Sequence, residues 1–481
     1  MSHFSFTLAG IFFLLLQVSV SVHILLHKDD VPSAIGWMGL VWLAPILGSI
    51  LYILFGINRI RRKARRLHGR KHSSPPRGEN RTDERQHLSP SLRQLLHLGY
   101  QIHPQAFTTA NRLTPLKNGD EAYPRMCAAI AAARREVLLA SYIFNNDAAG
   151  QQFAAALKTA AAHGARVRVL VDGVGLHYSR PDIAHALRDV AEIEFSVFLP
   201  SRSPITLPFV NLRNHRKLMI IDGEIAFFGG MNIAQGNLVA ANPKDPIQDI
   251  TFEIRGPVIE QIEQLFEEDW VFSGKKPFRA AAPQHAAAQR TQQPPQTPPA
   301  KQTPARIIPD GPDGDYGKFE RLCLGALCCA QKSIRIVTPY FLPGNEILTA
   351  LETAAGRGVT VEIILPQKSN IFGMDWAMRA NFPRLLKNGV HIYRARPPFD
   401  HSKLFLVDDI WLLAGSANWD QRSFKLNFES NIECFDSALA KQVAAIIRRK
   451  KENAAALSPA QKIPLLHTLA ANLFRLLTPY Y

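Results

Sequence analysis

Cysteine is scarce in this sequence and shows none of the spacings that bind metals. The 481 residues include five cysteines, an odd number, and no two of them have C-x-x-C spacing. A zinc site or a disulfide framework is therefore not expected. We interpret the cysteines as small apolar residues in a reducing compartment, and we expect neither a metal nor another cofactor.

Several common catalytic signatures are also missing. The sequence has no G-x-S-x-G nucleophile elbow, no Walker loop and no cluster of metal ligands. These absences argue against serine hydrolase, nucleotide-hydrolysing and metal-dependent chemistry. The reactive groups have to be sought among other residue types.

Acidic residues are few relative to basic ones, since 40 Asp and Glu face 56 Lys and Arg, a formal charge of +16. Eight of the thirteen residues from Arg59 to Lys71 are Lys or Arg, which is half of this excess. A basic balance favours anionic partners, either nucleic acid or an acidic membrane surface. The position of the basic segment next to an apolar run favours the membrane.

Charge is absent from two long segments, Phe4–Leu26 and Val31–Ile57. Each is long enough to cross a bilayer as a helix, which takes about 20 apolar residues. Pro45 is expected to kink the second segment. Two alternatives are a cleaved signal peptide for the first run, which lacks a basic start and a clear cleavage site, and a buried soluble hairpin.

The basic segment also predicts orientation, because positive residues near a span favour the cytoplasmic side. We therefore expect a transmembrane hairpin over residues 1–58 with both ends in the cytoplasm. A basic juxtamembrane linker would follow over residues 59–87.

The rest of the chain reads as two similar halves, 88–274 and 309–481, joined by a proline-rich linker over 275–308. Residues 275–310 contain eight prolines, a composition that forms no core. In each half a helix, an apolar strand, a second helix and another strand follow one another, with a C′ glycine (Gly164, Gly358) ending the second helix. This pattern predicts a duplicated α/β fold with a pseudo-twofold axis.

A short motif occurs once in each half: "HRKLMIID" from His215 and "HSKLFLVD" from His401. On a strand, His215 and Lys217 share a face, and so do His401 and Lys403. The aspartate of each copy falls on the other face, at the strand end, where we expect it to hold a turn. Each copy is followed at the same distance by G-[GS]-x-N, as "GGMN" and "GSAN".

Brought together, the two copies would surround one point with two imidazoles, two ammonium groups and two carboxamides. Such donors suit a phosphoryl centre. One imidazole can attack phosphorus while the other protonates the leaving alcohol. With unperturbed pKa values near 6.5, one charged and one neutral ring would be expected around neutrality.

These motifs resemble the HKD signature of the phospholipase D superfamily. The tandem halves, the N-terminal apolar hairpin and the strings "LRNHRK", "TPYFLP", "GSANWDQRSF" and "LNFE" resemble bacterial cardiolipin synthases. The resemblance implies two phospholipase D-like α/β sandwich halves and covers nearly the whole chain. It implies a phosphatidyltransferase in the bacterial inner membrane, multi-pass, with cytoplasmic catalytic domains.

The resemblance also carries residue roles to this sequence. His215 matches the nucleophile that becomes phosphohistidine, and His401 matches its acid–base partner. The motif positions grouped as catalytic are His215, Lys217, Asp222, His401, Lys403 and Asp408. Asn232 and Asn418 match phosphate-binding positions. Asp249 in the first half and Glu429 in the second fit the carboxylates that orient the histidines.

The expected reaction joins two phosphatidylglycerol molecules into cardiolipin and glycerol. The expected partners are this anionic phospholipid and the membrane, and no nucleic acid is expected. The alternatives are a phospholipase D-type hydrolase, transfer from another donor such as phosphatidylethanolamine, a nuclease and an inactive membrane scaffold. Asp400, next to His401, departs from many relatives. Strand parity points it away from the pocket, so we expect little effect on catalysis, but the departure suggests a sub-branch and leaves its second substrate open.

The C-terminal stretch "IPLLHTLAANLFRLLTPYY" spaces its leucines as one face of a helix. Packing of this face onto the second half is favoured over insertion into a lipid surface.

Overall fold

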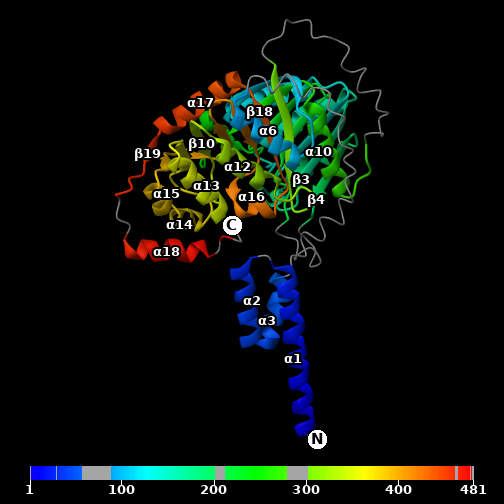
Figure 1. The fold of residues 1–481 in the computed structure, drawn as a ribbon. Coiled ribbons are helices and arrows are strands. Elements are labelled where there is room, and N and C mark those ends of the chain that lie inside the picture. The colour runs from blue at the N-terminus through cyan, green and yellow to red at the C-terminus, as the bar shows by residue number, and fades with distance from the viewer. Residues whose placement is uncertain are drawn as a thin grey trace. The chain divides into compact units, whose positions relative to one another are not determined.

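The computed structural model describes residues 2–28, 30–56, 88–200, 212–278, 302–460, 464–476 and 478. The chain forms two compact units, residues 1–66 and 67–481, which are treated separately (Figure 1). The basic segment Arg59–Lys71 and residues 279–301 of the proline-rich linker lie outside the described residues.

The first unit contains the helices α1 (Ser2–His27), α2 (Val31–Leu43) and α3 (Pro45–Leu51), followed by the π-helical turn η1 (Tyr52–Gly56). Within α1, residues Gly10–His27 are long and apolar enough to cross a membrane. Asp30 caps α2, because its carboxylate accepts the backbone N–H of Ser33 at 2.9 Å. The unit therefore carries one helix with the length and composition of a membrane span.

The second apolar run does not form the single kinked span that the sequence predicts. The backbone leaves the helical region at Ala44 (φ −137°, ψ 78°), so that α2 and α3 are separate helices. Gly48 allows α3 to approach α2, since a Cβ there would lie 2.4 Å from the Leu40 carbonyl oxygen. With 13 residues, α2 extends over only about 20 Å, which is shorter than the hydrocarbon core. The predicted hairpin of two spanning helices is thus replaced by one long helix and two short ones.

The second unit is built on one sheet that joins fifteen strands of the described residues. From the outer edge to the centre, the first half contributes β4 (Ile193–Phe198), β3 (Arg166–Asp172), β2 (Glu136–Ser141), β5 (Lys217–Ile221), β6 (Ile225–Gly229), β8 (Ile250–Arg255) and β1 (Thr108–Lys117). The second half repeats this order with β13 (His391–Ala395), β12 (Thr360–Pro366), β10 (Ser333–Val337), β15 (Leu404–Val407), β16 (Trp411–Gly415), β18 (Glu429–Phe435) and β9 (Thr303–Asp310).

The two halves also agree in strand direction. In each, the three outer strands are parallel and the remaining ones antiparallel. The halves join where β1 pairs antiparallel with β9. A short strand β19 (Ala454–Ala456) extends the edge of the second half. The duplicated α/β fold with a pseudo-twofold relation between its halves is therefore confirmed.

Helices cover both faces of the sheet (Figure 1). In the first half these are α7 (Asn118–Ala131), α8 (Ala148–Ala162), α9 (Ile183–Leu187) and α10 (Ile259–Phe272). In the second they are α12 (Lys318–Cys329), α13 (Asn345–Gly356), α14 (Met374–Arg379), α15 (Phe382–Lys387), α16 (Gln421–Lys425), α17 (Ser437–Glu452) and α18 (Leu465–Arg475). Because both faces are covered, β2 and β5 carry consecutive apolar residues, Val137–Ala140 and Leu218–Ile221, rather than an alternating pattern.

The turns between helix and strand follow the sequence closely. Gly164 and Gly358 have φ values of +86° and +87°, the left-handed conformation expected after a helix. Each is followed within two residues by a buried strand, β3 or β12. The predicted C′ glycines are confirmed.

Two domain boundaries differ from those expected. Helix α6 (Pro90–Ile102), assigned by sequence to the first half, packs with α12 of the second half, and Leu95 and Phe319 share one core cluster. Strand β9 begins at Thr303, inside the range assigned to the linker. Composition located the proline-rich stretch, but it could not show at which residue the chain joins the sheet again.

Candidate active site

The two motif strands, β5 and β15, begin just after the histidines. The segment before β5 crosses to the other half, where His215 N–H donates to the Phe428 carbonyl at 2.9 Å. The segment before β15 does the same, since β14 (Phe399–Asp400) pairs with β7 (Ile247–Gln248) and His401 N–H donates to the Gln248 carbonyl. His215 therefore lies beside Glu429, the residue after Phe428. His401 likewise lies beside Asp249, the residue after Gln248.

That residue is a carboxylate in both cases. The Nδ1 atom of His215 lies 3.0 Å from both carboxylate oxygens of Glu429. The Nδ1 atom of His401 lies 2.9 Å from Oδ2 of Asp249. Because the carboxylates accept the proton on Nδ1, each Nε2 is left as the basic nitrogen. Each half thus supplies the carboxylate that orients the histidine of the other half. The sequence predicted which carboxylates orient the histidines, but not that they do so across the two halves.

The motif lysines lie within the same buried region. Lys217 Nζ donates to the His215 carbonyl at 2.6 Å, and Lys403 Nζ donates to the His401 carbonyl. Lys403 Nζ is also 2.9 Å from Nδ1 of His401. Both groups are donors when Nδ1 carries its proton, so the bond that orients this ring is the one to Asp249.

The two motifs converge on one centre. The charge of Lys403 acts on His215, and the charge of Lys217 acts on His401, in each case lowering the pKa of the ring. Gly230 of "GGMN" is in contact with the other half, because a Cβ there would lie 2.8 Å from Cδ of Lys403. A side chain at this position would displace the side chain of Lys403.

Burial lowers the pKa of both imidazoles to about 4, and the nearby lysines add to this effect. Both rings are therefore neutral in the unliganded site at pH 7, in contrast to the expectation of one charged ring. Burial also lowers the pKa of Lys403, to about 8, against the attraction of Asp249 and Glu429. Burial and repulsion from Lys403 lower the pKa of Lys217 as well. The site therefore favours the binding of an anionic group.

Glu429 remains ionised although it is fully buried. Burial raises its pKa, but His215, Lys217 and Ser416 outweigh this effect and lower it to about 2. Its oxygens accept further bonds from Ser416 at 2.5 Å, Ser423 at 2.9 Å and Asn427 at 3.1 Å. These three residues lie in the quoted strings "GSANWDQRSF" and "LNFES", yet sequence reasoning gave them no role.

The two motif asparagines also lie in the site region. Oδ1 of Asn232 accepts the backbone N–H of Ile143 at 3.1 Å. Asn418 is buried, its backbone N–H donates to Ser423, and Oδ1 of its side chain has no partner among the described residues. Both amides can serve as donors to a phosphoryl group, the role that the resemblance implies.

Other positioning residues were missed altogether. Asp172 accepts the backbone N–H of Asn214 at 2.9 Å, and Arg216 donates to Asp269 at 2.5 Å and to the Glu429 carbonyl at 3.0 Å. These bonds fix the segment around His215 against both halves. Isolated aspartates on an apolar strand and helix gave no sequence signal of this function.

Each imidazole also packs edge-on against a tyrosine. The ring of Tyr142 lies 5.1 Å from that of His215, and the ring of Tyr340 lies 6.2 Å from that of His401. Burial raises the pKa of both phenols, which therefore stay neutral. The tyrosines close the site laterally and limit the motion of the rings.

Asp222 and Asp408 lie at the opposite ends of β5 and β15 from the histidines. Asp222 accepts the backbone N–H groups of residues 134–136, and Asp408 accepts those of residues 331–333. Both have φ +53°, a left-handed turn. Asp222 and Asp408 were grouped with the catalytic residues of the motif, but their side chains hold a loop, as the strand parity predicts.

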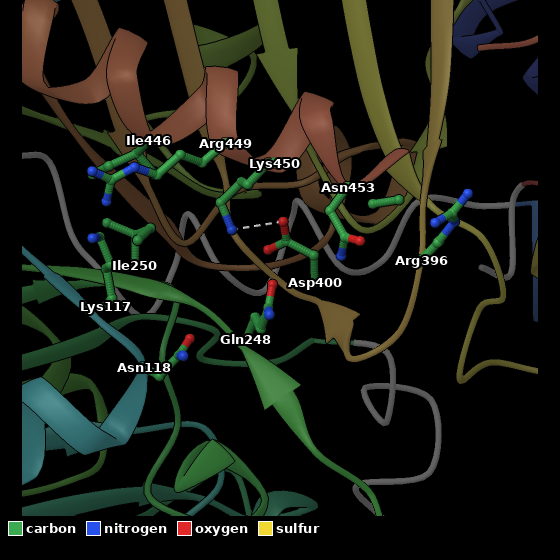
Figure 2. A pocket seen from close by; sticks show the side chains of 11 residues that line it. Lys117, Asn118, Gln248, Ile250, Arg396, Asp400, Ile446, Arg449, Lys450 and Asn453 are labelled. Atoms are coloured by element: carbon green, nitrogen blue, oxygen red, sulfur yellow. Dashed lines mark hydrogen bonds and ion pairs between the residues drawn. The ribbon is translucent and has the colours of Figure 1, made fainter. Parts of the chain in front are cut away.

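Asp400 faces the other side of its strand from His401. It is buried and accepts a hydrogen bond from the hydroxyl of Ser402. It also pairs with Lys450 at 2.7 Å, as Figure 2 shows. The pair lies in a small cavity of about 190 Å³ at the seam of the halves, also lined by Lys117 and Arg449. The departure from the family pattern is thus accommodated outside the catalytic centre.

Within the described ranges, no group of three or more His, Cys, Asp or Glu side chains is placed to hold a metal ion. The five cysteines are free thiols, and Cys323 and Cys434 are buried in the apolar core.

A doubled HKD motif joined across one sheet defines a phospholipase D-like site. The family model "Cardiolipin synthase, PLD-like domain" matches residues 126–270 and 324–451, and "Phospholipase_D-nuclease N-terminal" matches residues 15–56. The chain therefore belongs to the cardiolipin synthase family of the phospholipase D superfamily, and it is a phosphatidyltransferase by class.

Individual relatives agree with this assignment. A cardiolipin synthase of Geobacillus kaustophilus is 33% identical over 436 residues, 88% of this chain and 84% of the relative. The major cardiolipin synthase ClsA of Bacillus subtilis is 29% identical over 452 residues, 92% of each chain. A crystal structure of phosphatidylserine synthase from Haemophilus influenzae matches with a TM-score of 0.61 at 15% identity, over 81% of this chain and 97% of that one, and supports the fold.

Burial of two neutral histidines predicts a specific dependence of stability on pH. The folded-state pKa values, about 4, lie below the unfolded value near 6.5. Between these values the unfolded chain binds more protons, so the free energy of unfolding should fall by about 1.4 kcal/mol per pH unit per histidine as the pH drops. A His215→Asn/His401→Asn variant should show a flatter profile in thermal unfolding from pH 6.5 to 4. Parallel profiles would contradict the assignment.

The loop-holding aspartates predict a separation of stability from catalysis. Asn tolerates the left-handed turn, so Asp222→Asn removes chiefly the charge that accepts three backbone N–H groups. We expect a loss of about 1–2 kcal/mol in unfolding free energy with kcat within a few-fold of wild type. Asp408→Asn should behave alike. A large loss of kcat at unchanged stability would place these residues in the reaction after all.

Proposed function

We propose that this protein is a cardiolipin synthase that transfers a phosphatidyl group from one phosphatidylglycerol to another, releasing glycerol. The observation that carries the proposal is the crossed arrangement of His215 with Glu429 and His401 with Asp249, beside two buried lysines. Two imidazoles with basic Nε2 atoms and two cations are what a double displacement at an anionic phosphorus requires.

In the first step, Nε2 of His215 attacks the phosphorus of one phosphatidylglycerol. A P–N bond forms, and the P–O bond to the glycerol headgroup breaks. The leaving oxygen takes a proton from Nε2 of His401. Glu429, ionised and accepting the Nδ1 proton of His215, stabilises the positive charge that the phosphorylated ring acquires.

His401 has to be protonated before it can act as the acid. The bound phosphodiester supplies a negative charge that offsets the two lysines, which raises the pKa of this ring when substrate is present. Asp249 then holds an imidazolium rather than a neutral ring. Substrate binding thus prepares its own proton donor.

In the second step, Nε2 of His401 removes a proton from the terminal hydroxyl of a second phosphatidylglycerol. The resulting oxygen attacks phosphorus, the P–N bond breaks, and cardiolipin leaves with both imidazoles restored. One phosphodiester replaces another, so the reaction requires no energy source. Lys217, Lys403, Asn232 and Asn418 are the proposed donors to the phosphoryl oxygens.

Transfer rather than hydrolysis is supported by the apolar N-terminal helices. A chain held at a membrane by α1 has acceptor lipid concentrated beside it, whereas water has to reach a buried phosphohistidine. We propose that these helices anchor the protein in the bacterial inner membrane. The basic segment Arg59–Lys71 supports a cytoplasmic location for the catalytic unit.

The products distinguish transfer from its alternatives. The purified full-length chain with phosphatidylglycerol vesicles should yield one glycerol for each four-chain lipid. Phosphatidic acid without the four-chain lipid would identify a hydrolase instead. Release of ethanolamine with formation of cardiolipin from mixed lipids would identify phosphatidylethanolamine as the donor.

Both histidines should be indispensable. His215→Ala and His401→Ala should each lower the rate of transfer by roughly a thousandfold or more, because each removes one displacement or its proton transfer. The control His163→Ala removes an exposed imidazole at the end of α8 and should leave the rate unchanged. Circular dichroism and thermal unfolding check the fold. Substantial turnover in either motif variant would contradict the two-histidine mechanism.

A further inference from the structure

Helix α18 turns its leucines away from the protein. Between 57% and 77% of each residue is exposed in the set that we call the leucine face: Leu465, Leu466, Leu469, Leu473 and Leu476. At about 100° per residue these positions fall within an arc of about 100°, a single apolar stripe. The helix is amphipathic, but with its apolar side outward.

The opposite side of α18 is the one that contacts the domain. The ring of His467 packs on Trp376 of α14 at 5.2 Å, and Ala471 is buried. His467, Thr468 and Asn472 line a cavity of about 840 Å³ between α18 and the helices α14 and α15. The expectation that the leucines pack onto the second half is therefore wrong, because His467, Ala471 and Phe474 take that position.

A loop beside α18 extends the apolar surface. Residues 367–373 connect β12 to α14, and in this loop Phe372 is 86% exposed and Ile371 is 39% exposed. The rings of Phe372 and Phe474 lie 5.6 Å apart, edge to face, which joins the loop to the helix. The leucine face, Ile371 and Phe372 together are called the apolar surface below.

The same loop is coupled to the catalytic centre. Asn370 accepts a hydrogen bond from the hydroxyl of Tyr340 at 2.7 Å, and Tyr340 packs against His401. In the first half, the loop after β3 carries Tyr178, which is 59% exposed and packs on Tyr142, the neighbour of His215. In the first half, two tyrosines thus lead from His215 to the surface. In the second half, Tyr340 and Asn370 connect His401 to the loop that carries Phe372.

We propose that the apolar surface inserts into the interfacial region of the membrane and holds the entrance of the active site against the lipid. A soluble domain that leaves seven large apolar side chains exposed in one region has to cover them. This chain carries a helix suited to a bilayer, so lipid is always within reach of the catalytic unit. A helix with a full stripe of leucine opposite a polar side is suited to lie in the interface plane.

Docking would deliver substrate directly to the site. Phosphatidylglycerol would have to move only from the interface past Tyr178 or Phe372 to reach the histidines, with its acyl chains remaining in apolar surroundings. Only this delivery of substrate rests on the proposed reaction. The contact itself is independent of which phospholipid reacts.

The test is the depth of residue 469 in a membrane. An environment-sensitive fluorophore replaces Leu469 in the full-length chain, which is reconstituted into vesicles of phosphatidylethanolamine and phosphatidylglycerol. Lipids brominated on their acyl chains should quench it several-fold more than they quench the same fluorophore at Lys441. Lys441 is exposed on α17, a helix that Figure 1 shows apart from α18.

Two outcomes would overturn the proposal. Equal weak quenching at both positions, with full access to aqueous iodide, would show that the leucine face stays in water. Protection from iodide without quenching by brominated lipid would show that protein covers it, for example a second copy of this chain.

Activity provides a second readout. Leu466→Ser/Leu469→Ser/Leu473→Ser should raise the KM for vesicle lipid about tenfold or more and change kcat little, whereas the matching triple Met variant should behave as wild type. The serine residues lie on an exposed face, so thermal unfolding should be unchanged. If the chain labelled at residue 469 transfers phosphatidyl groups but is not quenched by brominated lipid, the docking is refuted and the reaction is not. If it is quenched but does not transfer, the reaction is refuted and the docking is not.

Discussion

The structure depends on the exchange of carboxylates between its halves. His215 is oriented by Glu429 and His401 by Asp249, so neither half contains a complete catalytic pair. The sheet that runs unbroken through β1 and β9 keeps the two pairs in register. Arg216 reinforces this arrangement from within, since it bridges Asp269 of one half and the Glu429 backbone of the other. Buried ionic groups of this kind add little net stability, and their value here is that they specify one geometry.

Much of this arrangement could be predicted from the sequence because the chain is duplicated. The repeated motif, the C′ glycines and the strand parity predicted the fold, the convergence of His215 and His401, and the loop-holding position of Asp222. The exchange of carboxylates could not be predicted, because spacing along the chain does not show which strand a segment crosses to join. The same holds for α6, whose leucines indicate a helix but not the half on which it packs.

Electrostatics and packing account for the remaining differences. A reference pKa near 6.5 suggested one charged imidazole, but burial and two lysines keep both rings neutral until an anion arrives. The leucine stripe suggested a buried helix face, yet α18 contacts the domain through the opposite side, with His467, Ala471 and Phe474. The neutral imidazoles favour a site that becomes active when it binds the anionic phospholipid. The exposed leucines favour a surface that contacts the membrane.

The most direct test of the central claim is the number of phosphatidyl groups that one chain can hold. Rapid acid-free quenching of the full-length protein during turnover of labelled phosphatidylglycerol, followed by peptide mapping, counts and locates them. A single site built from both halves predicts at most one group per chain, attached to His215. Label approaching two groups per chain, or present on both histidines at once, would show that each half works alone and would contradict the account.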